Sequence, residues 1–187
     1  MRPSGPESVG SPSAEPLAEP SGSRAVFRGH WIRVDEEEWP GIGTWEVVRP
    51  KDAAAVLPLT PDGDVLLVRQ FRAGARRQIE EIPAGLLDVE GEDPASCAAR
   101  ELFEETGFRH TSLEPLATVH TSPGSSSELV HLFVARTEAE PERAQEEGIE
   151  VVRRPLDAAV ADARAGRIDD AKTALALLLT DARRVAG

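Results

Sequence analysis

The sequence contains no tyrosine, a single cysteine and only two lysines, at positions 51 and 172. One cysteine, Cys97, cannot form an internal disulfide, and we expect it to be a small core residue rather than a nucleophile. No apolar run approaches the roughly 20 residues of a membrane-spanning helix, and the N-terminus lacks the apolar segment of a secretory signal. These absences predict a cytoplasmic protein without a membrane partner.

The chain also lacks basic runs, and its 187 residues carry a formal net charge of -12. This balance argues against a nucleic acid as partner. A phosphate-containing small molecule is compatible with the charge, because a metal ion and a few arginines can be focused in one cleft. The length fits one ordinary domain with a sizeable core, plus a tail or a small subdomain.

Composition divides the chain into three segments. Residues 1–23 are rich in Pro, Ser, Gly and Glu, so we expect a disordered tail. Residues 24–50 contain two β-rich stretches joined by an acidic turn, which predicts a small antiparallel subdomain before the main domain of residues 51–187. Three tryptophans in the small subdomain either fill a thin core or lie at a dimer interface or against a purine base: Trp31, Trp39 and Trp45.

A helix with clear start and stop signals is predicted for residues 94–106. Asp93 fits the N-cap position, and Pro94 fits the first turn, where a backbone N–H is not needed. Gly107 fits the left-handed position that commonly ends a helix. The capping residues therefore define both ends of this element.

Glu101, Glu104 and Glu105 share one face of this helix, because they are spaced at i, i+3 and i+4. Packing like charges in this way costs about 0.2–0.5 kcal/mol per pair. A divalent cation with oxygen ligands would remove that cost, whereas a solvated charged face is the commoner explanation of such a run by itself. Arg100 precedes Glu104 by four residues and can hold one carboxylate in place.

The full pattern around the helix is more specific than its charge. Gly85 and Glu92 are followed, after seven residues, by the run RELFEETGF of residues 100–108. This arrangement resembles the Nudix box of the Nudix hydrolases, with six residues between the first Gly and the first Glu where the family usually has five. The extra residue precedes the helix, so we expect a slightly longer loop and an intact metal-binding face.

The resemblance implies a Nudix fold, an α+β structure (α/β/α sandwich) with a mixed central sheet. It also implies a loop-helix-loop that binds Mg²⁺ or Mn²⁺ and cleaves a nucleoside diphosphate linked to another group. The metal ligands that it implies are Glu101, Glu105 and the carbonyl of Ala84, with Glu104 as a further ligand or a catalytic acceptor. Structural roles in the box fall to Gly85, Glu92, Arg100 and Gly107.

A second set of residues resembles the ADP-ribose pyrophosphatase branch of this family. Gln70-x-Arg72 and the run Glu81-x-Pro-Ala-Gly match its substrate site, which implies that Arg72 and Glu81 contact the substrate. Pro123 follows Gly107 by sixteen residues and matches the proline that marks the branch. A turn proline is the plain alternative, since Ser-Pro-Gly turns are common.

The resemblance places a catalytic base on the charged loop of residues 138–147. Glu146 aligns best with that position and Glu147 second, and the length of the loop leaves the choice open. Composition by itself indicates only a solvated loop. His120 and His131 are expected in strands rather than as metal ligands, because neither has a His or Cys partner at ligand spacing.

Periodicity and turn residues predict the remaining elements. Residues 53–59 and 64–71 form an expected hairpin around the turn at residues 60–63. Further strands are expected at residues 116–120, 128–136 and 148–152, and helices at residues 155–165 and 169–185. In the last helix we expect the apolar stripe to consist of Ala174, Leu175, Leu178 and Leu179.

The reaction implied by the resemblance is hydrolysis of ADP-ribose to AMP and ribose 5-phosphate. Two alternatives remain open: another nucleoside diphosphate sugar or a dinucleotide as substrate, and a non-catalytic module that binds ADP-ribose as a regulatory ligand. N-terminal strands exchange between two subunits in that family. The resemblance therefore implies a homodimer in which residues 24–50 serve dimerisation.

Overall fold

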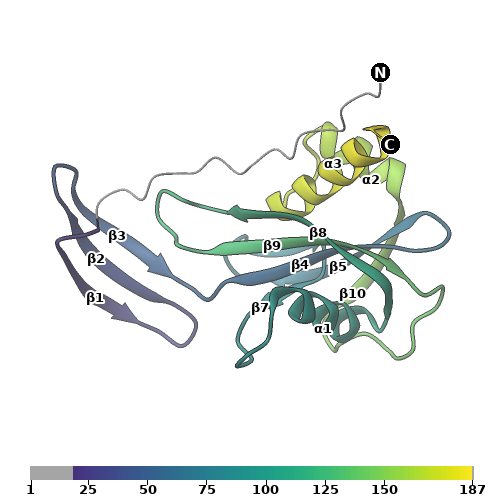
Figure 1. Ribbon diagram of the computed structural model, residues 1–187. Coiled ribbons are helices and arrows are strands. Elements are labelled where there is room, and N and C mark those ends of the chain that lie inside the picture. Colours follow the sequence, from purple (N-terminus) through teal and green to yellow (C-terminus); the bar gives the residue numbers. More distant parts are fainter. Residues whose placement is uncertain (1–18, 187) are drawn as a thin grey trace, which may run out of the picture.

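The computed structural model describes residues 19–186 (Figure 1). A mixed seven-stranded sheet lies between layers of helices, and a three-stranded antiparallel sheet precedes it in the chain. The α+β class expected from the sequence is therefore confirmed. The predicted tail comprised residues 1–23, of which residues 1–18 lie outside the described residues. The first strand begins at Gly22, two residues earlier than the predicted end of the tail would allow.

The large sheet has the strand order β10-β5-β4-β9-β8, while β6 pairs with β5 and β7 pairs with β4. Strands β4 and β9 run parallel and the other pairs are antiparallel. The strands are β4 (Ala53–Leu59), β5 (Asp64–Arg72), β6 (Arg77–Glu81), β7 (Ala84–Leu86), β8 (His110–His120), β9 (Leu129–Thr137) and β10 (Glu150–Pro155).

The expected hairpin of β4 and β5 is present, but the two strands diverge beyond its turn. They pair only where Leu59 lies opposite Val65. Residues 77–86 fill the gap between the two strands, because β6 pairs with β5 and β7 pairs with β4. The N–H of Val56 also donates a hydrogen bond to the carbonyl of Pro83 (3.0 Å). This divergence brings the segment from Glu81 to Gly85 into the middle of the sheet.

Two strands differ from the sequence expectation. Strand β8 begins at His110, six residues before the expected start, and its register shifts near Ser112 and again near Ala117. Such bulges interrupt the two-residue alternation on which strand prediction depends. Strand β6 was not among the expected strands, because a strand of five residues with three charged side chains carries a weak apolar signal.

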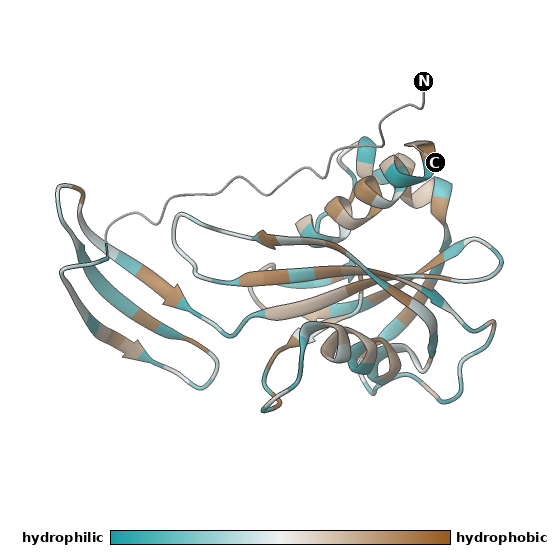
Figure 2. Cartoon of the chain, viewed as in Figure 1, coloured by the Kyte–Doolittle hydropathy of each residue, from teal (hydrophilic) through white to brown (hydrophobic). Residues whose placement is uncertain are grey.

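Helix α1 (Pro94–Thr106) covers one face of the large sheet, and α2 (Leu156–Arg164) and α3 (Ala171–Ala186) cover the other (Figure 1). Each face has its own apolar core, and Figure 2 shows hydrophobic residues concentrated along the central strands. No helix among residues 19–186 is long and apolar enough to cross a membrane.

The buried stripe of α3 differs from the one expected. Leu175 and Leu179 are half-buried as packing residues, but Leu178 is exposed. Two threonines face inward, and the hydroxyl of Thr173 accepts a hydrogen bond from the N–H of Ile82 (2.8 Å). Apolar periodicity alone misses a polar position such as Thr173, which is buried through hydrogen bonds. The buried positions are Thr173, Ala176, Leu177 and Thr180.

The small sheet consists of β1 (Gly22–Arg28), β2 (Arg33–Trp39) and β3 (Gly43–Arg49) in that order. Two stretches were expected, but the first one contains a hairpin, closed by a hydrogen bond from the N–H of Gly29 to the carbonyl of Ile32 (2.8 Å). In Figure 1 this sheet projects away from the helices. Val48 links it to the β8–β9 loop, with hydrogen bonds to Ser125 (2.8 Å) and Ser127 (3.1 Å).

Candidate active site

Helix α1 begins and ends at the residues that its caps predict. The Oδ1 atom of Asp93 accepts hydrogen bonds from the N–H groups of Ala95 (2.9 Å) and Ser96 (3.1 Å). Gly107 has a φ of 78°, in the left-handed region that favours glycine. These caps fix the helical register and therefore the direction in which the three glutamates point.

Arg100 holds three carboxylates together beside α1. Its Nε and Nη2 bind the two oxygens of Glu92 at 2.9 and 3.0 Å, and its Nη1 binds Glu101 (2.6 Å) and Glu104 (2.9 Å). The hydrogen bonds from Arg100 lower the pKa of the Glu92 carboxyl. A guanidinium with this many acceptors orients the carboxylates and reduces their mutual repulsion.

Glu101 lies directly against the backbone of Gly85. A Cβ atom added at Gly85 would lie 1.9 Å from Oε1 of Glu101, so any other residue would displace the carboxylate. Burial raises the pKa of Glu101, and the hydrogen bond from Arg100 opposes that rise. The glycine is thus required by a side chain sixteen residues further along the chain.

Glu105 is the most buried carboxylate of α1, with 5 % of its surface exposed. It accepts hydrogen bonds from the N–H of Ala84 (3.2 Å) and from Nε2 of Gln70 (3.3 Å). Both bonds are longer than the usual 2.9–3.0 Å or so. Burial raises the pKa of Glu105 to about 7. The two hydrogen bonds and the charge of Arg72 oppose this rise but do not offset it.

These groups fit a hard divalent cation. Carboxylate and carbonyl oxygens are the ligands that Mg²⁺ and Mn²⁺ prefer. The missing side chain of Gly85 lets the Glu101 carboxylate lie against the backbone next to Ala84, and Glu105 is a buried, weakly bonded carboxylate. Within residues 19–186 no three acidic, His or Cys side chains converge as a ready metal group. Glu101 and Glu104 each use one oxygen to bind Arg100, which leaves the second oxygen of each carboxylate for a metal ion.

Arg72, the last residue of β5, and Glu81, the last residue of β6, form an ion pair, with Nε 2.5 Å from Oε1. The Glu81 side chain is only 3 % exposed, and its second oxygen is bound by Lys172 from the first turn of α3. Lys172 also lies 3.0 Å from Asp170. Sequence reasoning missed Lys172, although its rarity as one of two lysines in an arginine-rich chain was a possible signal.

The other candidate residues lie in loops or strands outside this group. Pro123 is in the β8–β9 loop, and Glu146 and Glu147 are exposed in the loop before β10. Among the described residues, no hydrogen bond or ion pair joins these three to the carboxylates of α1. His120 and His131 lie in β8 and β9, as expected.

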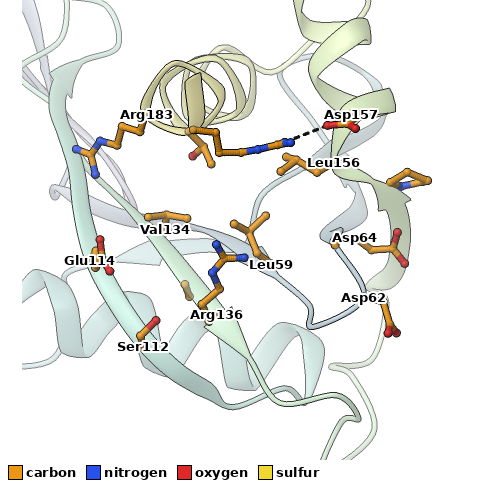
Figure 3. A pocket seen from close by; sticks show the side chains of 15 residues that line it. Leu59, Asp62, Asp64, Ser112, Glu114, Val134, Arg136, Leu156, Asp157 and Arg183 are labelled. Carbon is orange, nitrogen blue, oxygen red and sulfur yellow. Dashed lines mark hydrogen bonds and ion pairs between the residues drawn. The ribbon is translucent and has the colours of Figure 1, made fainter. Parts of the chain in front are cut away.

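A cavity of about 630 Å³ lies on the opposite face of the large sheet, where α2 and α3 cover it (Figure 3). Leu59, Val134 and Leu156 line it, Arg136 points into it, and the ion-paired Asp157 lies at its edge. None of the candidate catalytic or metal-binding residues lines this cavity. The candidate site is therefore defined by its carboxylates and not by this cavity.

Comparison with known proteins gives consistent matches. The model of the NUDIX domain family matches residues 49–176. An ADP-ribose pyrophosphatase of Bacillus subtilis (strain 168) is 40% identical over 160 residues, and a methanol dehydrogenase activator of Bacillus methanolicus is 37% identical over 160 residues; each alignment covers 81% of this chain and 86% of the relative. A solved structure of an ADP compounds hydrolase has a TM-score of 0.74 and 26% identity, covering 92% of this chain and 98% of that chain.

Proposed function

Because the chain belongs to the Nudix hydrolase family, we propose that it hydrolyses the pyrophosphate bond of ADP-ribose, with Mg²⁺ or Mn²⁺, to AMP and ribose 5-phosphate. The relative named ADP-ribose pyrophosphatase supports this substrate. One structural observation carries the proposal: Gln70 binds Glu105, while Arg72, two residues along the same strand, binds Glu81. An acidic helix face and a phosphate-binding arginine are thereby neighbours.

We assign the metal to the oxygens of Glu101 and Glu105 and the carbonyl of Ala84, with Glu104 as a further ligand or acceptor. When bound, the cation cancels phosphate charge and makes a water molecule more acidic. The buried and weakly bonded Glu105 supports this assignment. Arg100, which binds Glu101 and Glu104, orients both carboxylates.

Arg72 would bind the anionic oxygens of the diphosphate. Its Nε donates a hydrogen bond to Glu81, whereas its two terminal NH₂ groups donate none within residues 19–186. Two parallel N–H donors of a guanidinium match two oxygens of a phosphate. Glu81 holds the guanidinium in place, because its own carboxylate is fixed by Lys172 on the other oxygen. Pro123 remains a proposed substrate contact by family pattern.

A glutamate of the loop before β10 would accept the proton of the attacking water. Glu146 and Glu147 are exposed, and Gly148 beside them has a φ of 86°. General bases need to come within about 2.6–3.2 Å of the water, which a mobile loop can achieve once substrate is bound. Glu146 is our first choice and Glu147 the second.

The proposal is tested by measuring AMP release from ADP-ribose with Mg²⁺ or Mn²⁺, for the wild type, Glu105→Gln and the control Glu114→Gln. Glu114 is an exposed strand residue on the edge of the far cavity. We expect activity in the wild type and the control and a loss of at least about 100-fold in Glu105→Gln, as for loss of a charge-stabilising group. Other nucleoside diphosphate sugars and dinucleotides are run beside it. Faster cleavage of one of these compounds would make it the substrate in place of ADP-ribose. Tight binding of ADP-ribose without cleavage would indicate a regulatory protein.

We also propose a homodimer built through the small sheet. Phe27, Trp31, Ile42 and Trp45 are exposed on it, Trp31 to 68 % of its surface. Aromatic side chains are enriched in protein interfaces. One oxygen of the buried Glu37 has no donor within residues 19–186, which a partner subunit could supply. The cytoplasmic location and the lack of a nucleic-acid partner remain predictions.

A further inference from the structure

The aromatic ring of Phe103, in the last turn of α1, makes cation–π contacts with Arg109 and Arg143, which belong to other segments. The guanidinium carbon of Arg109 lies 4.2 Å from the centre of the Phe103 ring, and that of Arg143 lies 4.6 Å from it. Nε of Arg143 also reaches the carbonyl of Phe103 (3.4 Å). Cation–π contacts of this length are attractive even at exposed sites. Arg143 belongs to the loop that carries the proposed base.

The backbone of the same loop touches the end of the helix. The N–H of Glu142 donates to the carbonyl of Gly107 (2.8 Å), and the Glu142 carboxylate is ion-paired with Arg109. A Cβ atom at Gly107 would lie 2.0 Å from the carbonyl oxygen of Arg143, so the missing side chain permits this approach. Residues 141–143 are thus held by side-chain and main-chain contacts together.

The second half of the loop is attached only at its ends. No hydrogen bond or ion pair among the described residues joins residues 144–149 to another segment, and β10 starts at Glu150. From Arg143 to Glu146 an extended chain spans at most about 11 Å. That is close to the roughly 10–12 Å diameter of a helix with its side chains. Glu146 can therefore reach around the end of α1, but not far beyond it.

We propose that Phe103, Arg109 and Arg143 form a clasp that positions the loop base against the carboxylate face of α1. Phe103 is about 200° from Glu101 around the helix, on the side away from the metal-binding face. The clasp therefore acts through the loop and not by touching the substrate or the metal. This inference rests on the proposed hydrolysis, in which a loop glutamate accepts a proton.

The test uses the full chain with Phe103→Leu, which removes the ring, and Phe103→Tyr, which keeps it. We expect kcat for ADP-ribose to fall about three- to tenfold in the leucine variant, as for loss of two exposed cation–π contacts, with KM changed less than about twofold. Amide hydrogen exchange of residues 142–149 should become faster, and Mn²⁺ affinity without substrate should stay unchanged. The tyrosine variant should match the wild type in all three measurements.

Arg143→Met should reproduce the kinetic defect, and Arg184→Met is its matched control, because Arg184 pairs with Asp157 on the far side of the molecule. An unchanged kcat in Phe103→Leu despite faster exchange would overturn the positioning role. Equal defects in the leucine and tyrosine variants, or a parallel loss of Mn²⁺ affinity, would do so too. A wild type without activity would instead reject the proposed hydrolysis, and the exchange data would still decide whether the clasp holds the loop.

Discussion

Lys172 binds the oxygen of Glu81 that Arg72 leaves free, so one buried carboxylate is held between two cations. Removing one partner of a buried ion pair leaves an uncompensated charge and loosens the remaining partner. We expect Lys172→Met to raise KM for ADP-ribose about tenfold through a misplaced Arg72, with a smaller change in kcat. Steady-state kinetics over a range of substrate concentrations measures both values.

The chain offers a matched control for this substitution, because the only other lysine, Lys51, is exposed. Lys51→Met should behave like the wild type, and Lys172→Arg should recover most of the affinity because it keeps the charge. Equal KM values for the two methionine variants would show that Lys172 does not position Arg72.

Glu105 should make the metal-free protein less stable as the pH rises. Burial raises the pKa of its carboxyl from 4.5 to about 7 in the folded state. A raised pKa means that the folded state binds the proton more tightly, so the stabilisation is complete below about pH 4.5 and is lost as the pH rises through 7. In the presence of a chelator, we expect the Tm of the wild type to fall over this range relative to that of Glu105→Gln.

Mn²⁺ provides the second arm of that experiment. A cation bound to the ionised carboxylate stabilises the folded state by mass action, so added Mn²⁺ should restore the wild-type Tm at pH 8 and leave Glu105→Gln little changed. Parallel Tm curves for the two chelated proteins would contradict the raised pKa.

Helix α1 could be predicted from the sequence because its determinants are local. The cap at Asp93, the glycine at position 107 and the spacing of the glutamates all lie within a few turns of one another. The contact of Lys172 with Glu81 could not be predicted in this way. It joins residues 91 positions apart and depends on how α3 packs against the segment that fills the gap between β4 and β5.

The sequence also could not decide between the two loop glutamates, because neighbouring residues in a turn carry the same local signal. Both glutamates are exposed in a turn that is closed by a hydrogen bond from the N–H of Ile149 to the carbonyl of Glu146 (3.2 Å). We expect only one of Glu146→Gln and Glu147→Gln to lose about 100-fold or more in kcat, the usual effect of removing a general base. Glu140→Gln, exposed on the same loop, is the control. Full activity in both variants would place the base elsewhere.

The exposed apolar residues of the small sheet predict that the isolated chain is not the active form. Stable interfaces bury about 1,200–2,000 Å² in total, with aromatic side chains at their centre. We expect light scattering to give twice the mass of one chain for the wild type, and a monomer with at least about tenfold lower activity for Phe27→Asp. Val185→Asp is the control, because Val185 is 79 % exposed on α3, far along the chain from the small sheet. If the wild type is monomeric and active, the small sheet has no role in assembly; if Phe27→Asp is monomeric with full activity, the partner contributes nothing to the site.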